Sequence, residues 1–291
     1  MVKKLDVFNV VVGMIFAVLC FVMLYPFIYA LSYSLSDTIL AAQKNVVFLP
    51  RGFTVQNYQL IFSDKRILTG FFISVGRTAL GTTVFLFTTG LCAYSMSKPR
   101  LKGRKFLFIF FVIPLYVSGG MLPLYVTIHD LHLFNNFLVY IFPPCFSGFF
   151  MFLMKVYLET IPTSLEESAM IDGAGDLTIA FKIYAPLAVP MIATIALFMG
   201  VFQWNSWFDA LLYVTKTQLQ PLQLVLQNIL AQTQIENIMQ VASIKSGGQL
   251  SVNAESYKMA VLIMTTLPIV FIYPFAQKYF VKGMMIGAVK L

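Results

Sequence analysis

The chain has 291 residues, of which 59% are hydrophobic and 11% are charged. Soluble domains carry about a quarter charged residues, so this composition excludes an ordinary soluble domain and predicts an integral membrane protein. The formal net charge of +8 could indicate binding to nucleic acid, but ten of the twenty Lys and Arg residues lie in three short segments that flank apolar runs. Membrane topology explains basic residues at such positions, so we expect no nucleic-acid partner.

Six apolar stretches are long enough to cross a bilayer, since a helix needs about 20 residues to span the hydrocarbon core. We therefore predict an all-α integral membrane fold that forms a single transmembrane domain over 1–291. The six predicted transmembrane helices lie at about 8–32, 71–95, 106–126, 137–157, 187–207 and 257–281. Proline interrupts several of them, and interrupted spans are typical of a transport bundle rather than of a simple anchor.

Basic residues predict the orientation of these spans. The segment between the second and third spans has five of them and no acidic residue: Lys98, Arg100, Lys102, Arg104 and Lys105. Further lysines precede the first span and follow the last one. The positive-inside rule places all three segments in the cytoplasm, together with both termini and the 158–186 connection.

Arg77 is the one basic residue that we place well inside a predicted span. Desolvating a guanidinium group there is costly unless something compensates for it. Its stem could reach the outer interface, which is the interpretation we favour, or it could pair with a neighbouring subunit or contact an acidic substrate. The spans offer no Asp or Glu as a proton carrier, which disfavours the alternative of an ion-coupled transporter or channel that works without an ATPase.

The connection between the fourth and fifth spans is a polar, acidic segment in an otherwise apolar chain. Ser164 and Glu167 have the spacing of a capping box at a helix start. Gly173 and Gly175 allow a left-handed turn, after which Asp176 can cap a second helix. We predict a helix-turn-helix elbow on the membrane surface, which suits docking better than catalysis.

The same elbow, at 163–186, resembles the EAA signature of membrane subunits of bacterial ABC importers. In that signature Glu-Ala-Ala is followed at fixed spacings by Gly, Ile and Pro, here with Ser168 in place of the first Ala. Two further stretches, 48–58 and 277–290, resemble the first outer loop and the C-terminus of carbohydrate-uptake permeases of the maltose type. The resemblance extends over nearly the whole chain.

The resemblance implies a permease subunit in the bacterial cell membrane that is not an enzyme. Its implied partners are a second, homologous permease, an ATPase dimer that binds ATP and Mg, an extracytoplasmic solute-binding protein and an oligosaccharide substrate. Acidic, uronate-containing fragments such as those of alginate or pectin are one implied substrate class. The elbow would be the coupling helix that docks on the ATPase, through Glu166, Glu167, Ser168, Ala169, Asp172, Gly173, Ala174, Ile183 and Pro186.

Other candidate sites are weak. A phosphate-binding loop is absent, and two histidines, His129 and His132, are too few for a zinc site, so we expect no cofactor, metal or catalytic residue. The polar segment 208–256 has an amphipathic helical stripe, including Leu222, Leu226 and Ile229. It could be a helix on the outer face of the bundle or, as the resemblance implies, a loop that approaches the solute-binding protein.

Overall fold

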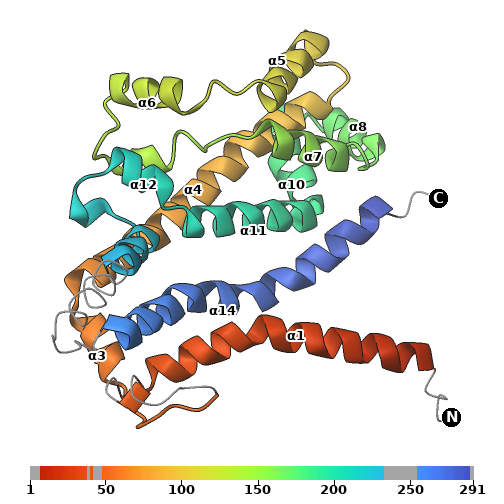
Figure 1. Cartoon of the computed structure of the whole chain (residues 1–291). Helices are drawn as coiled ribbons and strands as arrows, with labels where there is room; N and C mark the ends of the chain where they lie inside the picture. Colours follow the sequence, from red (N-terminus) through yellow and green to blue (C-terminus); the bar gives the residue numbers. More distant parts are fainter. Residues whose placement is uncertain (1–6, 38–39, 42–47, 233–253, 289–291) are drawn as a thin grey trace. The chain divides into compact units, whose positions relative to one another are not determined.

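The computed structural model describes residues 7–37, 40–41, 48–232 and 254–288 (Figure 1). Regular structure within these residues is helical, apart from an isolated antiparallel bridge between Ser36 and Phe53. This confirms the predicted all-α fold. The chain divides into two compact units, one of Met1–Leu68 with Val225–Pro268 and one of Thr69–Leu224 with Ile269–Leu291.

The first unit contains α1 (Val7–Ser34), α3 (Gln56–Ser63) and the first part of α14 (Ala254–Ala288). α1 is apolar on all sides and exposed along most of its length, as expected of a helix that lies in lipid. Its end is fixed to α3, because Asn57 Nδ2 donates to the Ser34 carbonyl at 2.9 Å. The Ser34 hydroxyl also lies 2.8 Å from the Tyr58 hydroxyl.

The second unit is built on α4 (Lys65–Ser97), which runs through it from Thr69 onward. α7 (Gly148–Leu158) and α11 (Val189–Asn205) contribute to the same apolar core. The fully buried members of this core include Phe85, Met151 and Ile195. The core therefore joins helices that are separated in sequence, and it supports the elbow from one side.

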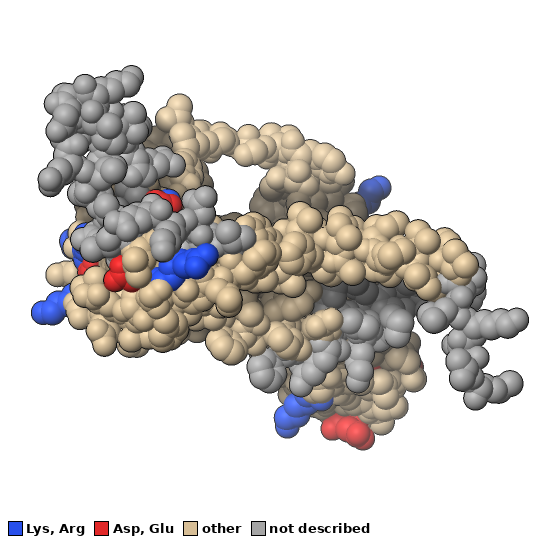
Figure 2. Space-filling view, turned by 60° about the horizontal axis from the view of Figure 1, so that its bottom comes forward, with Lys and Arg blue, Asp and Glu red and all other residues tan. Residues whose placement is uncertain are grey.

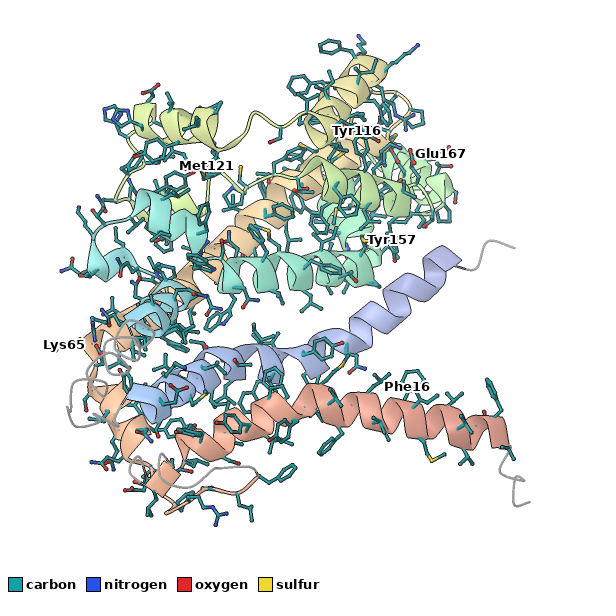
Figure 3. The ribbon with its side chains drawn as sticks, in the orientation of Figure 1. Phe16, Lys65, Tyr116, Met121, Tyr157 and Glu167 are labelled. Carbon is teal, nitrogen blue, oxygen red and sulfur yellow. The ribbon has the colours of Figure 1, made fainter. Side chains whose placement is uncertain are left out.

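The predicted third span, 106–126, is wrong as a continuous helix. α5 (Arg104–Tyr116) and α6 (Met121–Asp130) are separate helices that meet at 114°. α5 ends where Val117 becomes extended, and Gly120, with a φ of +83°, directly precedes α6. Figure 3 labels Tyr116 and Met121 on either side of this break.

The predicted fourth span, 137–157, is helical only in its second half. It starts as a single 3₁₀ turn, η1 (Phe137–Tyr140), continues through the non-helical Pro143-Pro144 pair, and becomes α7 at Gly148. Two consecutive prolines remove two backbone donors and prevent a helix from continuing. The helix that remains has 11 residues, which is too short to cross a bilayer alone.

The predicted fifth span agrees with α11, but a second bend precedes it. α8 (Thr163–Ile171) leads to α9 (Asp176–Ile179), a π-helical turn η2 (Ala180–Tyr184) and α10 (Ala185–Leu187). This stretch from α9 to α10 meets α11 at 82°.

Three described helices, α1, α4 and α14, are long and apolar enough to span a membrane, and each bent pair would add one more. The count of six spans, like the single domain over 1–291, stays a prediction. Most of the described surface on the face seen in Figure 2 belongs to residues other than Lys, Arg, Asp and Glu, which gather in small patches. Such a surface suits a protein that is largely surrounded by lipid.

Beyond α11 the chain forms α12 (Phe208–Tyr213), a 3₁₀ turn η3 (Thr217–Leu219) and a helix over 222–232. Leu222, Leu226 and Ile229 are buried in that last helix, as its amphipathic stripe predicts. Residues 233–253, the remainder of the loop that could approach a solute-binding protein, lie outside the described residues.

Candidate functional site

The turn of the elbow follows from a C-terminal capping motif. α8 ends before Gly173, which has a φ of +80°. The Gly173 amide donates to the Met170 carbonyl at 3.0 Å, and the Ala174 amide donates to the Ala169 carbonyl at 2.9 Å. This is the Schellman motif, and it confirms the predicted left-handed turn at Gly173. Because a Cβ at Gly173 would meet nothing within 4 Å, the glycine is needed for its backbone conformation and not for space.

The predicted capping box is wrong. α8 begins at Thr163, directly after Pro162, and no side chain caps it. Ser164 lies inside the first turn, where its carbonyl accepts a hydrogen bond from the Ser168 hydroxyl at 2.9 Å. Pro162 itself occupies the cap position, so Ser164 is the second helical residue and cannot act as the cap.

The predicted cap of the second helix is also wrong. Gly175 has an ordinary φ of −76° and occupies the cap position, while Asp176 is the first residue of α9 and makes no capping hydrogen bond. Its carboxylate instead pairs with the Arg100 guanidinium, from the loop that follows α4. Asp176 therefore connects the elbow to another part of the second unit.

Glu166 forms the base of the elbow and is buried, with 8% of its surface exposed. Lys98 Nζ lies 2.5 Å from its Oε2 atom, and the Tyr184 hydroxyl donates to the same oxygen at 2.7 Å. Arg100 approaches the other carboxylate oxygen at 3.3 Å. A single carboxylate thus joins α8 to the end of α4 and to η2.

Two aromatic rings complete the surroundings of Lys98. Its ammonium group lies 3.5 Å from the centre of the Tyr184 ring and 4.3 Å from that of the Tyr94 ring. The rings meet edge to face at 5.3 Å. Cation–π contacts of this kind are stronger where water is excluded, which fits the burial of Lys98. Lys98, Glu166, Tyr94 and Tyr184 together are called the elbow anchor below.

Burial and charge act in opposite directions on the two ionic groups of the elbow anchor. Burial lowers the pKa of Lys98 below its ordinary value, and the neighbouring Glu166 offsets this effect only in part. Burial by itself would raise the pKa of Glu166, but hydrogen bonds from Lys98 and Tyr184, together with the charges of Lys98 and Arg100, lower that pKa below 4.5. Glu166 is therefore ionised at neutral pH.

The opposite side of α8 is exposed and partly apolar. Glu167, Ser168 and Asp172 are exposed, and Figure 3 labels Glu167 on this helix. Ile171 is 87% exposed and Leu177 is 66% exposed. Large apolar side chains that are exposed on a polar segment indicate a contact surface.

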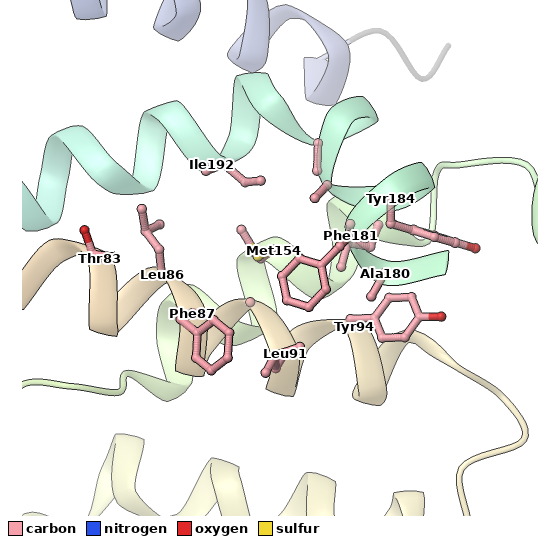
Figure 4. A pocket seen from close by; sticks show the side chains of 14 residues that line it. Thr83, Leu86, Phe87, Leu91, Tyr94, Met154, Ala180, Phe181, Tyr184 and Ile192 are labelled. Atoms are coloured by element: carbon pink, nitrogen blue, oxygen red, sulfur yellow. The ribbon is translucent and has the colours of Figure 1, made fainter. Parts of the chain in front are cut away.

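An apolar hollow of about 280 Å³ lies where α4, η2 and α11 approach one another (Figure 4). Thr83, Phe87 and Leu91 of α4 form one wall, and Phe181 and Ile192 belong to the opposite side. Its lining carries no charged side chain. This hollow therefore offers no groups that would hold an ion or a charged ligand.

Arg77 lies away from the elbow and is fully buried, with 0% of its surface exposed. Its NH2 atom donates to Asp209 Oδ2 at 2.6 Å and to Gln203 Oε1 at 3.0 Å, and its NH1 atom donates to the Ser206 carbonyl at 3.1 Å. The guanidinium also lies 4.3 Å from the centre of the Tyr140 ring. The favoured interpretation, in which the stem reaches the outer interface, stays a prediction. The charge has its partner within the same chain, and the Arg77 side chain is not exposed.

The chain matches a known protein family. Residues 86–286 match the family described as the binding-protein-dependent transport system inner membrane component. The chain belongs to this family. Among its relatives is the polygalacturonan/rhamnogalacturonan transport system permease protein YtcP of Bacillus subtilis (strain 168), which is 35% identical over 277 residues and matches 95% of each chain. The arabinooligosaccharides transport system permease protein AraQ of Halalkalibacterium halodurans is 26% identical over 94% of each chain.

A solved structure is also similar. It is the crystal structure of a bacterial ABC transporter involved in the import of the acidic polysaccharide alginate. The match has a TM-score of 0.86 with 30% identity and covers 94% of this chain and 96% of that one. Together these comparisons confirm the resemblance to ABC importer permeases.

In this inner membrane component, the residues expected to couple to an ATPase fall into two groups. Those that face the core of the second unit are Glu166, Ala169, Ala174 and Ile183. Those that are exposed are Glu167, Ser168, Asp172, Gly173 and Pro186. The second group lies on the surface, whereas the first group is buried or partly buried against the core.

Several residues of this permease's elbow were missed by sequence reasoning. In the sequence, Lys98 and Arg100 carry only a topology signal, and nothing marks Tyr94 and Tyr184 as aromatic partners. The exposed Ile171 could have been found, because it follows Glu167 and Ser168 at helical spacing on the same face. Asp209, the partner of Arg77, lies just beyond the predicted end of the fifth span.

Proposed function

We propose that the chain is one of two membrane-spanning subunits of an ATP-driven importer that receives oligosaccharides from an extracytoplasmic solute-binding protein. It would form half of the translocation pathway beside a second, homologous permease, and it would perform no catalysis itself. ATP and Mg would be bound by a partner ATPase dimer. Support comes from the family, from relatives that are transport permeases by name, and from their coverage of nearly the whole chain.

The observation that carries this proposal is the two-sided construction of α8. Its inner side is fixed by the buried Glu166, while its outer side exposes Glu167 and Ile171. A force applied to the outer side would be transmitted to the end of α4 through Lys98 and to η2 through Tyr184. These bonds would keep the elbow from moving independently of those two elements. A rigid connection of this kind suits the transmission of movement from an ATPase into a helical bundle.

The proposed orientation places the elbow and both termini in the cytoplasm. The basic segment between α4 and α5 supports it, because Lys and Arg are enriched in cytoplasmic loops. Lys98 and Arg100 of that segment contact the elbow directly, so the elbow and the most basic loop lie at the same membrane face.

We propose acidic, uronate-containing oligosaccharides as the substrate class. The support is that one relative is named for transport of polygalacturonan and rhamnogalacturonan, and that the similar solved structure belongs to an importer of alginate. Arg77 would not be the residue that recognises the acid, since it is buried and already paired.

Reconstitution into liposomes tests the proposal. The chain would be purified with its second permease, its ATPase and its solute-binding protein, and uptake of a galacturonate oligomer would be compared with uptake of a neutral oligosaccharide of equal length. We expect ATP-dependent uptake of the acidic oligomer, lost in Glu167→Lys and in Ile171→Asp although the subunits remain inserted. Uptake by the chain alone, driven by an ion gradient, would favour the ion-coupled alternative instead.

A further inference from the structure

A second charged site lies at the adjacent ends of α5 and α7. It is an open hollow of about 410 Å³ lined by Arg104, Lys105, Phe108 and Lys155. The two helices pack side by side here, because the rings of Phe108 and Phe152 meet edge to face at 5.0 Å. The hollow is therefore formed within one compact unit.

The hollow keeps an excess of positive charge after its internal ion pair is counted. Arg104 NH2 lies 2.7 Å from Glu159 Oε1, and Lys155 Nζ lies 2.9 Å from the same carboxylate. Lys105 has no ion pair with any residue that the structure describes. Three cations with one carboxylate leave two positive charges in this small space.

Two of the three cations at this site, Arg104 and Lys155, are held in place. Arg104 Nε donates to the Met96 carbonyl at 3.0 Å, which fixes the guanidinium against the end of α4. The Lys155 side chain is 13% exposed, so its stem is packed and only its end reaches the hollow. A ligand would therefore meet an arranged set of donors, with little ordering of side chains left to do.

Immediately beyond the cations, the surface of α5 is apolar and exposed. Phe106 is 71% exposed, Phe108 is 45% exposed and Ile109 is 50% exposed. A helix that begins with basic residues and continues with exposed aromatic and aliphatic ones places its first turn at the boundary between water and lipid. The hollow lies at this boundary.

We propose that this hollow binds the headgroup of an anionic phospholipid. The phosphate would lie among Arg104, Lys105 and Lys155, and an acyl chain would follow the exposed apolar side chains of α5. Basic hollows between transmembrane helices have the charge and position to bind such headgroups. A protein surface would satisfy the cations but would leave the adjoining aromatic residues in contact with water, so the observations favour a lipid.

The test uses the full chain assembled with its partner subunits in nanodiscs. Discs of phosphatidylcholine with one-fifth phosphatidylglycerol are compared with discs of phosphatidylcholine alone, and the retained lipid is measured by native mass spectrometry. Lys105→Gln is the informative variant, because Lys105 is exposed and supports no ion pair of the fold among the described residues. Lys102→Gln is the matched control, since Lys102 is an exposed lysine just before α5 that does not line the hollow.

We expect Lys105→Gln to lower phosphatidylglycerol retention about fivefold, the change that corresponds to about 1 kcal/mol per lysine at a membrane surface. Lys102→Gln should change it less than twofold, and inorganic phosphate at millimolar concentration should not displace the lipid. The proposal is overturned if both variants retain lipid equally, or if phosphate alone competes fully. It is also overturned if Lys105→Gln releases the ATPase while lipid retention stays unchanged, which would identify a protein contact.

Discussion

Glu166 and Glu167 are consecutive in the chain and lie in opposite environments. Glu166 is 8% exposed and bonded to Lys98 and Tyr184, whereas Glu167 is exposed. Consecutive residues point about 100° apart on a helix, so one can face the core while the next faces a partner. The two carboxylates therefore have separate tasks, and variants can distinguish them.

Removal of the charge at Glu166 should destabilise the protein strongly. Glu166→Gln leaves the buried Lys98 without a counter-charge, which costs about 3–5 kcal/mol. Glu167→Gln should change stability by less than about 0.5 kcal/mol, since it removes an exposed charge. Thermal unfolding of the purified chain in detergent measures both. Equal unfolding midpoints for the two variants would contradict the assignment of Glu166 as an anchor.

A double variant provides the control for that experiment. Lys98→Met combined with Glu166→Leu removes both buried charges, so it should be more stable than either single variant. Additive losses would mean that the two residues do not act as a pair.

The contribution of Glu166 should depend on pH in a defined direction. Its pKa in the folded protein lies below 4.5, so its stabilising effect is complete above that pH and is lost as the pH falls through the lowered value. The difference in unfolding midpoint between the natural chain and Glu166→Gln should be constant near pH 7 and should shrink below pH 4.5. A difference that grew on acidification would refute the ionised, paired state.

The effect of a substitution at Gly173 should depend only on how well the new residue adopts a positive φ. The glycine's φ of +80° disfavours a β-branched residue, and a Cβ added there would meet nothing within 4 Å. Gly173→Val should lose about 1–2 kcal/mol and most ATPase stimulation, while Gly173→Asn should lose less, because Asn accepts left-handed conformations. Gly175→Ala is the control, since Gly175 has an ordinary φ and equal space. Identical behaviour of Asn and Val at position 173 would show that side-chain size, not φ, governs this turn.

A substitution at Gly81 tests whether the side chains around Arg77 are held in fixed positions. A Cβ there would collide with the side-chain amide of Gln203, which is held because it donates to the Tyr140 carbonyl at 3.0 Å and accepts from Arg77. Gly81→Ala should therefore cost about 1–3 kcal/mol, as overpacking does. Gly76→Ala, on the same helix with only ordinary contacts to Phe137, should be neutral or slightly stabilising. The midpoints of thermal unfolding of the two variants measure this difference. Similar midpoints would argue against a fixed Gln203 side chain.

Long apolar runs predicted α1, α4 and α14 well, because a continuous run of this length has few alternatives in a membrane. The breaks within the predicted spans were harder to predict, because hydropathy depends on amino-acid composition and not on backbone conformation. Gly119-Gly120 and Pro143-Pro144 were visible signals, and they mark the places where the predicted continuous helices failed.

The elbow was predictable from motif spacing, but its anchor was not. Lys98 and Glu166 are 68 residues apart, and Arg77 and Asp209 are 132 residues apart. Pairings over such separations depend on how helices pack, which a local pattern does not contain. Arg77 still gave a physical clue, because a guanidinium group in a span requires a counter-charge, and Asp209 lies four residues after the end of α11.

The buried pair of Arg77 and Asp209 should be structural rather than selective for substrate. Asp209→Asn leaves a fully buried guanidinium group without its counter-charge, so it should cost about 3–5 kcal/mol. Arg77→Gln should cost less, because the Asp209 side chain is 25% exposed and still accepts from the Ala210 amide at 2.8 Å.

In both variants, uptake of acidic and neutral oligosaccharides should fall together, in proportion to the amount of folded complex. Unfolding midpoints and parallel uptake assays measure this, with Arg66→Gln, which removes an exposed ion pair, as the control. If Arg77→Gln kept full stability and lost only uronate uptake, Arg77 would be a substrate contact after all.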